Sequence, residues 1–119
     1  MLFRSTTDAL KGVAGPWIGG SDARIKQDIV PYSTGLAAVL QLNPVEYSFI
    51  PETGLDSTRR HIGVIGQEVQ PIMPEMITTS SAAMGSLMID DLLIYNPNAL
   101  LYALVNAVKE LAARVPAPA

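Results

Sequence analysis

Ser21 and Lys26 have the side chains needed for serine-lysine chemistry, in which a hydroxyl attacks a carbonyl carbon and an amine takes up the proton. A serine hydroxyl is a weak nucleophile at neutral pH and needs a base nearby. A lysine amine can be that base only after it has lost its own proton. A neighbouring cation such as Arg24 favours that loss, whereas Asp22 or Asp28 would oppose it at close range. The pair is therefore a candidate nucleophile and base, with Arg24 as a candidate supporting residue.

The separation of five residues does not by itself place the two side chains together. Positions five apart lie on different faces of a helix and on opposite faces of a strand. A turn, or a lysine from another subunit, must bring Lys26 to Ser21. A serine five residues before a lysine occurs by chance in most proteins, so the surrounding sequence must decide its meaning. The preceding Gly19-Gly20 suits either a cleavable bond with an open approach or an ordinary flexible linker.

His61 and Glu68 are further polar candidates for supporting roles. His61 could assist at a catalytic site, although a residue at the edge of a strand more often forms local hydrogen bonds. Glu68 has two interpretations that the sequence leaves open. It caps the short helix that begins near Gln67, or it forms an ion pair with Arg59 or Arg60 of a neighbouring chain.

Several classes of site and partner are not expected from the composition. The chain has no cysteine and one histidine, so we expect no disulfide, no zinc site and no other cofactor. Gly63 and Gly66 lack the lysine that follows in a phosphate-binding loop. The net charge of −3, with no basic cluster beyond Arg59-Arg60, argues against nucleic-acid binding. No stretch approaches the roughly 18 apolar residues of a membrane span, so we expect no membrane partner.

The balance of apolar and charged residues points instead to a protein partner. A chain of 119 residues is long enough for one domain. Apolar residues make up 49% of it and charged residues only 16%, which is sparse for a soluble protein. We therefore expect a partner to cover part of the apolar surface.

The pattern along the chain predicts an α+β fold, with a small globular part made of a hairpin and short helices. Alternation of apolar and polar residues marks the strands, and capping residues mark the helices. In chain order we expect a helical turn within 21–29, a helix capped by Ser33 and covering 36–42, strands at 45–50 and 61–65 that pair as a hairpin, a short helix from Gln67 and a short strand at 87–89.

The clearest predicted element is a C-terminal helix at about 97–115. Asn96 can cap it, Pro97 suits the first helical position, and neither glycine nor proline occurs from 98 to 114. Apolar residues with 3-4-3-4 spacing form a seam: Leu101, Leu104, Val108, Leu111 and Val115. The seam fits either a coiled coil or a helix laid on the core of its own domain. Because two heptads are marginal in isolation, the globular part must also contribute to any association.

Four stretches, in the same order and at similar separations, resemble one family. Ser-Asp-Ala-Arg-Ile-Lys at 21–26 is similar to the opening signature of the self-cleaving intramolecular chaperone domains of phage tail spikes, tail fibres and endosialidases. Gly-Val-Ile-Gly-Gln-Glu-Val at 63–69 resembles the central stretch of that family, and 36–47 and 95–111 resemble two further parts. Gly66 departs from the family, which more often has alanine there.

The resemblance implies a homotrimer in which the C-terminal helices form a three-stranded coiled coil. Such domains drive trimeric assembly of the fibre that precedes them and then cut themselves off. By this resemblance Ser21 is the nucleophile, Lys26 is the base and the Gly20–Ser21 bond is cut. Residues 1–20 would be a linker or the end of the upstream fibre segment, 21–115 the chaperone domain and 116–119 a tail.

Two other functions compete with self-cleavage. One is a structural trimerisation cap that stays on a tail fibre and never cuts. The other is a module that frees a transcription factor, which is disfavoured because the chain lacks a basic DNA-binding region and a membrane span. The self-cleavage hypothesis places the protein in the host cytoplasm during assembly, and in the virion tail fibre or spike if it is not cleaved off.

Overall fold

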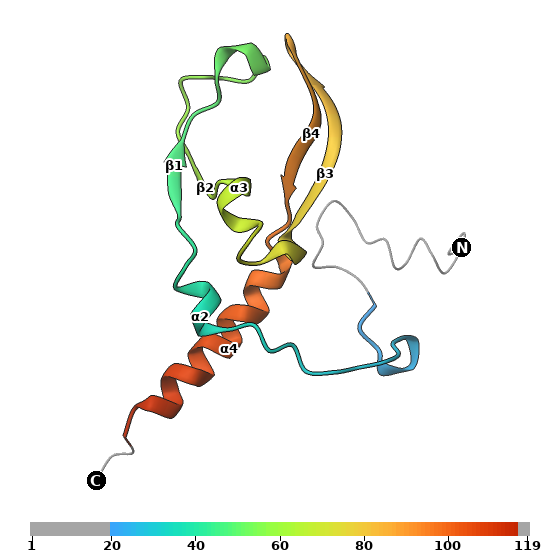
Figure 1. Ribbon diagram of the computed structural model, residues 1–119, viewed down its shortest axis with the longest axis vertical. Coiled ribbons are helices and arrows are strands. Elements are labelled where there is room, and N and C mark those ends of the chain that lie inside the picture. Colours follow the sequence, from blue (N-terminus) through green and yellow to red (C-terminus); the bar gives the residue numbers. More distant parts are fainter. Residues whose placement is uncertain (1–19, 117–119) are drawn as a thin grey trace, which may run out of the picture. The chain divides into compact units, whose positions relative to one another are not determined.

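The computed structural model describes residues 20–116, and the chain divides into two units, Met1–Tyr32 and Ser33–Ala119. Over the described residues the fold is α+β, with two antiparallel two-stranded sheets and a long C-terminal helix (Figure 1). In chain order the elements are η1 (Ala23–Ile25), α2 (Leu36–Val39), β1 (Val45–Tyr47), η2 (Pro51–Thr53), β2 (His61–Gly63), α3 (Gly66–Val69), η3 (Pro74–Met76), β3 (Ile77–Met84), β4 (Leu87–Tyr95) and α4 (Asn98–Arg114).

The described part of the first unit contains one element, the single turn of 3-10 helix η1. This confirms the helical turn expected within 21–29. All residues from Gly20 to Tyr32 are exposed in the single chain. The segment therefore takes its local shape from its own hydrogen bonds and not from a buried core.

In the second unit, β1 and β2 pair as the predicted hairpin, with Tyr47 opposite His61. Both strands are shorter than expected: β1 ends at Tyr47 and β2 at Gly63. The aromatic rings at this end pack together: Phe49 meets Tyr47 edge-on at 5.3 Å between centroids, and His61 stacks on Tyr47 at 5.4 Å. The hairpin therefore continues beyond its backbone ladder through side-chain packing.

The second hairpin, β3–β4, differs most from the sequence expectation. The predicted strand at 87–89 is part of the nine-residue β4, and β3 was not predicted at all. The stretch Thr78 to Ser81 is polar, so β3 lacks the apolar alternation that marks a strand. Pairing with the apolar β4 decides its conformation instead.

The tips of the two hairpins are joined. The backbone N–H of Ser86 donates to the carbonyl oxygen of Glu52 at 3.0 Å. Gly85 has a positive φ of 58°, and a Cβ atom there would collide with the same Glu52 carbonyl. Glycine at this turn therefore permits both the backbone conformation and the close approach. Figure 1 shows both hairpins at the same end of α4.

The core lies where α3, η3 and the start of β3 meet the first half of α4. Its buried residues are Val69, Met73, Met76, Ile77 and Ala103. The alanine allows close approach of α4. The short helix α2 packs on the same helix farther along, where Leu36 and Ala107 are buried.

Helix α2 begins at Leu36 as expected, but it ends at Val39 and its N-cap differs from the predicted one. Gly35, not Ser33, is its N-cap, and no side chain at that position provides a cap. Instead the Glu110 carboxylate of α4 accepts a hydrogen bond from the Leu36 N–H at 2.6 Å. A tertiary contact replaces the local cap that the sequence suggested.

Helix α4 is one residue shorter at each end than the predicted range of 97–115. Pro97 is the N-cap and not the first helical residue, while the Asn96 side chain accepts a hydrogen bond from the Asn98 N–H at 3.0 Å. Val115 is extended, because the residue before a proline, here Pro116, avoids the helical conformation.

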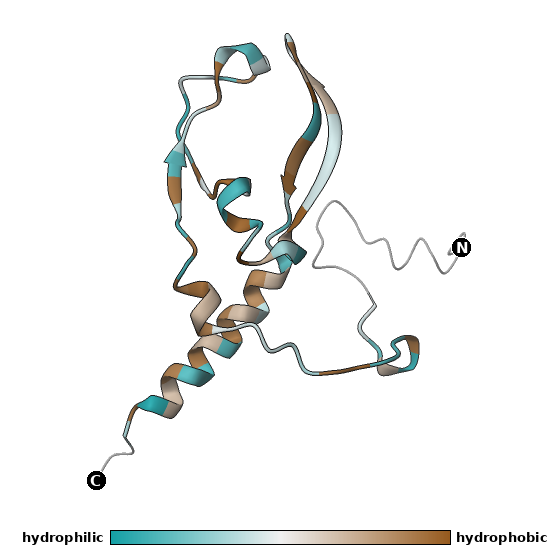
Figure 2. Ribbon diagram, viewed as in Figure 1, coloured by the Kyte–Doolittle hydropathy of each residue, from teal (hydrophilic) through white to brown (hydrophobic). Residues whose placement is uncertain are grey.

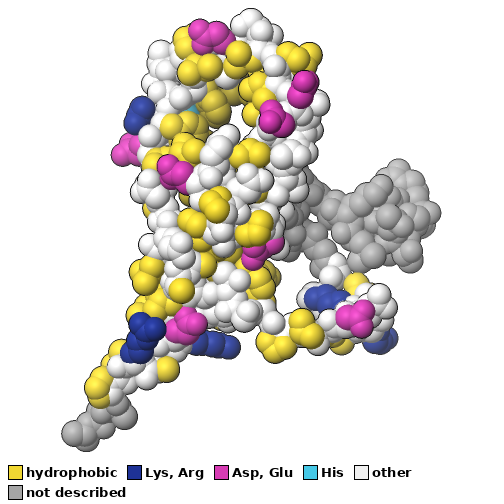
Figure 3. Space-filling view, in the orientation of Figure 1, with side chains coloured by type: hydrophobic (Ala, Val, Ile, Leu, Met, Phe, Trp, Pro, Cys, Tyr) yellow, Lys and Arg dark blue, Asp and Glu magenta, His cyan; other side chains and the backbone are white. Residues whose placement is uncertain are grey.

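The apolar seam does not lie on the core of its own chain. All five seam residues are between 40% and 68% exposed, and Tyr102 and Val105 beside them are at least half exposed. Ala103 and Ala107 provide the face that packs inward. Figure 2 shows apolar residues continuing along α4 away from the hairpins, and Figure 3 shows hydrophobic side chains on its surface. The interpretation of the seam as an internal packing face is therefore wrong.

Candidate functional site

The structure brings the side chains of Ser21 and Lys26 together. Lys26 Nζ donates to Ser21 Oγ at 3.0 Å. The 3-10 turn between them accounts for this, with hydrogen bonds from Ile25 N–H to the Asp22 carbonyl oxygen at 3.1 Å and from Lys26 N–H to the Ala23 carbonyl oxygen at 3.2 Å. The tight turn reverses the chain, so residues that no regular helix or strand would bring together can touch. The distance suits proton transfer between the two groups.

Asp22 and Arg24 form a second pair inside the same turn. Asp22 Oδ1 accepts from the Arg24 N–H at 2.9 Å and from Arg24 Nε at 3.1 Å. Asp22 Oδ2 accepts from Arg24 Nη2 at 2.7 Å. The bonds from the Arg24 side chain, followed by the bond from its N–H, hold the pKa of Asp22 below its ordinary value. The side-chain bonds also raise the pKa of Arg24.

This pairing changes the role expected of Arg24. The sequence suggested that Arg24 acts on Lys26 as a free cation and that Asp22 opposes it. In the structure the guanidinium and the carboxylate bind each other, so their charges largely cancel. Both Ser21 and Lys26 are exposed in the single chain.

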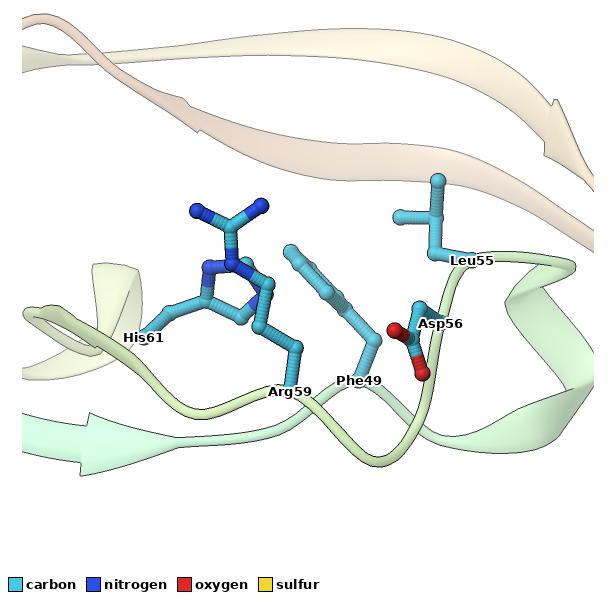
Figure 4. Close-up of a pocket in the computed structure, with 5 residues that line it drawn as sticks. All are labelled: Phe49, Leu55, Asp56, Arg59 and His61. Carbon is cyan, nitrogen blue, oxygen red and sulfur yellow. The ribbon is translucent and has the colours of Figure 1, made fainter.

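His61 belongs to the second unit, in the β1–β2 hairpin. It stacks on Tyr47 and lines a pocket of about 230 Å³ with Phe49, Leu55, Asp56 and Arg59. Figure 4 shows the side chains of His61, Arg59, Phe49 and Leu55 projecting to the same side of the hairpin. His61 is therefore part of an aromatic cluster at the end of the β1–β2 hairpin.

Asp56, which also lines this pocket, is fixed by its own turn. Its carboxylate accepts hydrogen bonds from the Thr58 hydroxyl at 2.6 Å and from the Thr58 N–H at 2.9 Å. These bonds lower the pKa of Asp56. The carboxylate thus has a structural role in the loop between η2 and β2.

Glu68 lies on α3 and accepts a hydrogen bond from the Asn43 side chain at 3.5 Å. The N-cap of α3 is Ile65, and no side chain caps the helix there. The interpretation of Glu68 as the cap of this helix is therefore wrong. Arg60 instead donates to the Ser48 hydroxyl at 3.3 Å. An ion pair of Glu68 with an arginine of a neighbouring chain stays a prediction.

Three of the five seam residues line a shallow apolar groove on α4. It is lined by Leu101, Leu104, Val105, Val108 and Lys109. The heptad pattern predicted three of these apolar residues. It missed Val105, which adjoins the seam at the next position after Leu104.

Neither a group of metal ligands nor a membrane-spanning helix is found among the described residues. From Gly20 to Pro116, no three His, Asp or Glu side chains are grouped as metal ligands would be. Within the same range no helix combines the length and apolar character needed to cross a bilayer.

Two comparisons with known proteins bear on this site. Residues 21–78 match the model of a peptidase family described as "Chaperone of endosialidase". The match begins at Ser21, contains Lys26 and the whole β1–β2 hairpin, and ends in β3. The chain also resembles the crystal structure of an intramolecular chaperone, with a TM-score of 0.51 and 19% identity over 80% of this chain and 100% of that one. At this identity the second likeness concerns the fold alone.

Proposed function

We propose a function that starts from the family match: residues 21–78 match the model of a peptidase family described as "Chaperone of endosialidase". The protein is a trimerisation chaperone for a phage tail spike or tail fibre. It releases itself by cutting its own chain between Gly20 and Ser21. The observation that carries this proposal is the 3.0 Å contact between Lys26 Nζ and Ser21 Oγ.

In the first step, the Ser21 hydroxyl attacks the carbonyl carbon of Gly20. Neutral Lys26 takes the hydroxyl proton and passes it to the departing amide nitrogen of Ser21. The C–N bond between the two residues breaks, and an ester forms between the Gly20 carbonyl and Ser21 Oγ. The chain is then linked through the side chain of Ser21.

In the second step, water hydrolyses this ester. Lys26 takes a proton from the attacking water and returns it to Ser21 Oγ, so the dyad ends in its starting state. The products are a C-terminal carboxylate on Gly20 and a free N-terminal amine on Ser21. The reaction needs no cofactor, and each chain undergoes it once.

The exposed seam on α4 supports the trimer. Large apolar side chains at 3-4-3-4 spacing, exposed along a helix whose small residues face inward, are the arrangement of a coiled-coil helix without its partners. Leu101, Leu104, Val108 and Leu111 would form the centre of a three-stranded coiled coil. Val115 lies past the helix end and would close it.

The client in this proposal is the fibre segment that precedes Ser21 and is joined to it through Gly20. Assembly takes place in the host cytoplasm, where three chains fold together. Cleavage then separates the trimeric fibre from its chaperone. If the chain stayed uncut, it would remain in the virion as part of the tail fibre or spike.

The competing function is a trimerisation cap that never cuts. The exposure of Ser21 and Lys26 in the single chain favours it, because water stabilises the charged form of an amine and a charged amine is no base. The two functions therefore differ in whether the trimer buries this turn.

Mass spectrometry of the freshly expressed 119-residue chain tests the proposal. We expect a fragment that begins at Ser21 and its complement that ends at Gly20. Ser21→Ala and Lys26→Ala should each leave the chain whole, while both still form trimers. An intact wild-type trimer would support the cap, and normal cleavage of Ser21→Ala would show that the nucleophile is wrongly assigned.

A further inference from the structure

The turn that joins Ser21 to Lys26 is capped by one side chain, that of Asp22. Asp22 is the N-cap of η1, and its Oδ1 atom accepts the Arg24 N–H at 2.9 Å. None of the three residues of η1 is buried. Packing by the described residues therefore contributes little to this turn, and its local hydrogen bonds must hold it.

We propose that Asp22 is a positioning residue for the cleavage reaction, because its carboxylate closes the turn that holds Lys26 against Ser21. The inference rests on the proposed self-cleavage. In this proposal Asp22 acts on Ser21 and Lys26 only through the backbone between them. Its contribution is to the geometry of the dyad and not to proton transfer.

The hydrogen-bond pattern explains how a single carboxylate can do this. Without a cap, the Arg24 N–H at the start of a 3-10 turn has no acceptor within the turn. Asp22 Oδ1 supplies that acceptor, and such a cap restricts the chain to the turn conformation. The turn then brings Lys26, the residue directly after η1, back toward Ser21.

Arg24 fixes the orientation of the capping carboxylate. Its Nε and Nη2 atoms bind the two carboxylate oxygens in a fork, at 3.1 Å to Oδ1 and 2.7 Å to Oδ2. This geometry turns Oδ1 toward the backbone N–H. Arg24 therefore supports Asp22, and replacing Arg24 should slow cleavage less than replacing Asp22 by alanine.

Substitutions can separate a geometric role from an electrostatic one. Asp22→Asn keeps the acceptor oxygen of the cap but removes the charge. Asp22→Ala removes both, and Arg24→Gln removes the fork while the cap remains. If Asp22 acts through geometry, asparagine must rescue much of what alanine loses. If it acts through charge, asparagine and alanine must behave alike.

The experiment measures the cleavage rate of the full chain for each variant over a series of pH values, together with its trimer content by native mass spectrometry. We expect Asp22→Ala to cut on the order of 10- to 100-fold more slowly, since small misplacements of catalytic groups have effects of this size. Asp22→Asn should stay within about threefold of the wild type. Asp22→Ala and Asp22→Asn both free Arg24 from its partner, so the midpoint of the pH profile should be the same in these two variants, and only the plateau should separate them.

The outcomes distinguish this inference from the proposed function. If the wild type is cut, Ser21→Ala is not, and Asp22→Ala cuts at the normal rate, the positioning role is overturned and self-cleavage stands. Equal loss in Asp22→Asn and Asp22→Ala with a shifted pH midpoint, or loss of the trimer in Asp22→Ala, also overturns it. A wild-type chain that never cuts overturns the proposed function itself.

Discussion

The Glu110 carboxylate accepts a hydrogen bond from the Leu36 N–H at 2.6 Å, across 74 positions of the chain. Asn106, one turn earlier on α4, donates from its side chain to the Thr34 carbonyl at 2.8 Å. The polar side chains of α4 thus hold the entry to α2, while its large apolar side chains stay exposed. The inward face of α4 therefore packs on its own chain, and the exposed seam is the face that the proposed trimer would use.

Replacing Glu110 by alanine should lower the free energy of unfolding by about 1 kcal/mol, because the Leu36 N–H loses its cap. Glu110→Gln should lose less, since its carbonyl oxygen can still accept. Chemical denaturation at one fixed chain concentration measures the free energy of unfolding of both variants. Arg114→Ala, an exposed change on the same helix, is the control and should have little effect. Equal stability of Glu110→Ala and the wild type would show that the cap contributes nothing.

Gly66→Ala should also destabilise the fold, although the residue begins a helix. A Cβ atom at Gly66 would lie 3.0 Å from Leu93 Cβ and 3.1 Å from its Cδ1, so Leu93 would have to shift. We expect a loss of about 1 kcal/mol in unfolding free energy, the lower end of the range for overpacking. The loss should shrink in a Leu93→Ala background, where part of the contact is gone. A more stable Gly66→Ala variant would contradict this reading of the contact.

The elements with a strong local pattern could be predicted from the sequence, and those set by distant contacts could not. The β1–β2 hairpin and α4 carry their periodicity within their own residues, and both were found near the expected positions. Strand β3 is polar over Thr78–Ser81 and is defined by its pairing with β4. The start of α2 is set by Glu110, which no local pattern reveals.

The candidate site shows the same division. The residue types of Ser21 and Lys26 and the need for a turn were evident, but spacing alone could not say how the turn is built. An aspartate two residues before the N–H that it caps is a signal from which the turn at Asp22 could have been predicted. That Arg24 pairs with Asp22, and does not act on Lys26 as a free cation, depends on side-chain geometry within the turn.

The carboxyl group of Asp22 should titrate at a lower pH than an ordinary aspartate. Because the hydrogen bonds from Arg24 depress its folded pKa, the stabilisation of the turn is complete above the unfolded value of about 3.9 and is lost as the pH falls through the lower folded value. Carbon-13 NMR of the uncut Ser21→Ala chain measures the midpoint. Arg24→Gln should raise it, whereas Arg59→Gln in the other unit should not. An unmoved midpoint in Arg24→Gln would contradict the fork.

Replacing Leu104 and Val108 together by aspartate should abolish the proposed trimer. Both side chains are exposed in the single chain, and in a coiled coil each would place three unpaired charges around the helix axis. Light scattering or native mass spectrometry should then give the mass of one chain. The matched control carries two aspartates at Tyr102 and Ala113, exposed positions of α4 outside the seam, and should stay trimeric. A wild-type monomer at micromolar concentration would remove the basis for the assembly role.

Cleavage should depend on assembly, because premature cutting would separate the chaperone from its client. In the single chain the contact between Ser21 and Lys26 is already made, yet both side chains are exposed. Contact alone therefore does not make Lys26 a base. Burial of this turn against another subunit would disfavour the charged amine and supply what the single chain lacks.

The Leu104→Asp, Val108→Asp double variant should accordingly remain uncut, although its Ser21, Lys26 and Asp22 are unchanged. The control with aspartates at Tyr102 and Ala113 should cut at the wild-type rate. In the wild-type trimer the rate should rise with pH and then level off, because only the neutral amine accepts a proton. Gel analysis of fractions with a verified oligomeric state measures each rate. Efficient cutting by a monomer would show that the dyad needs no partner, and the coupling between assembly and cleavage would have to be abandoned.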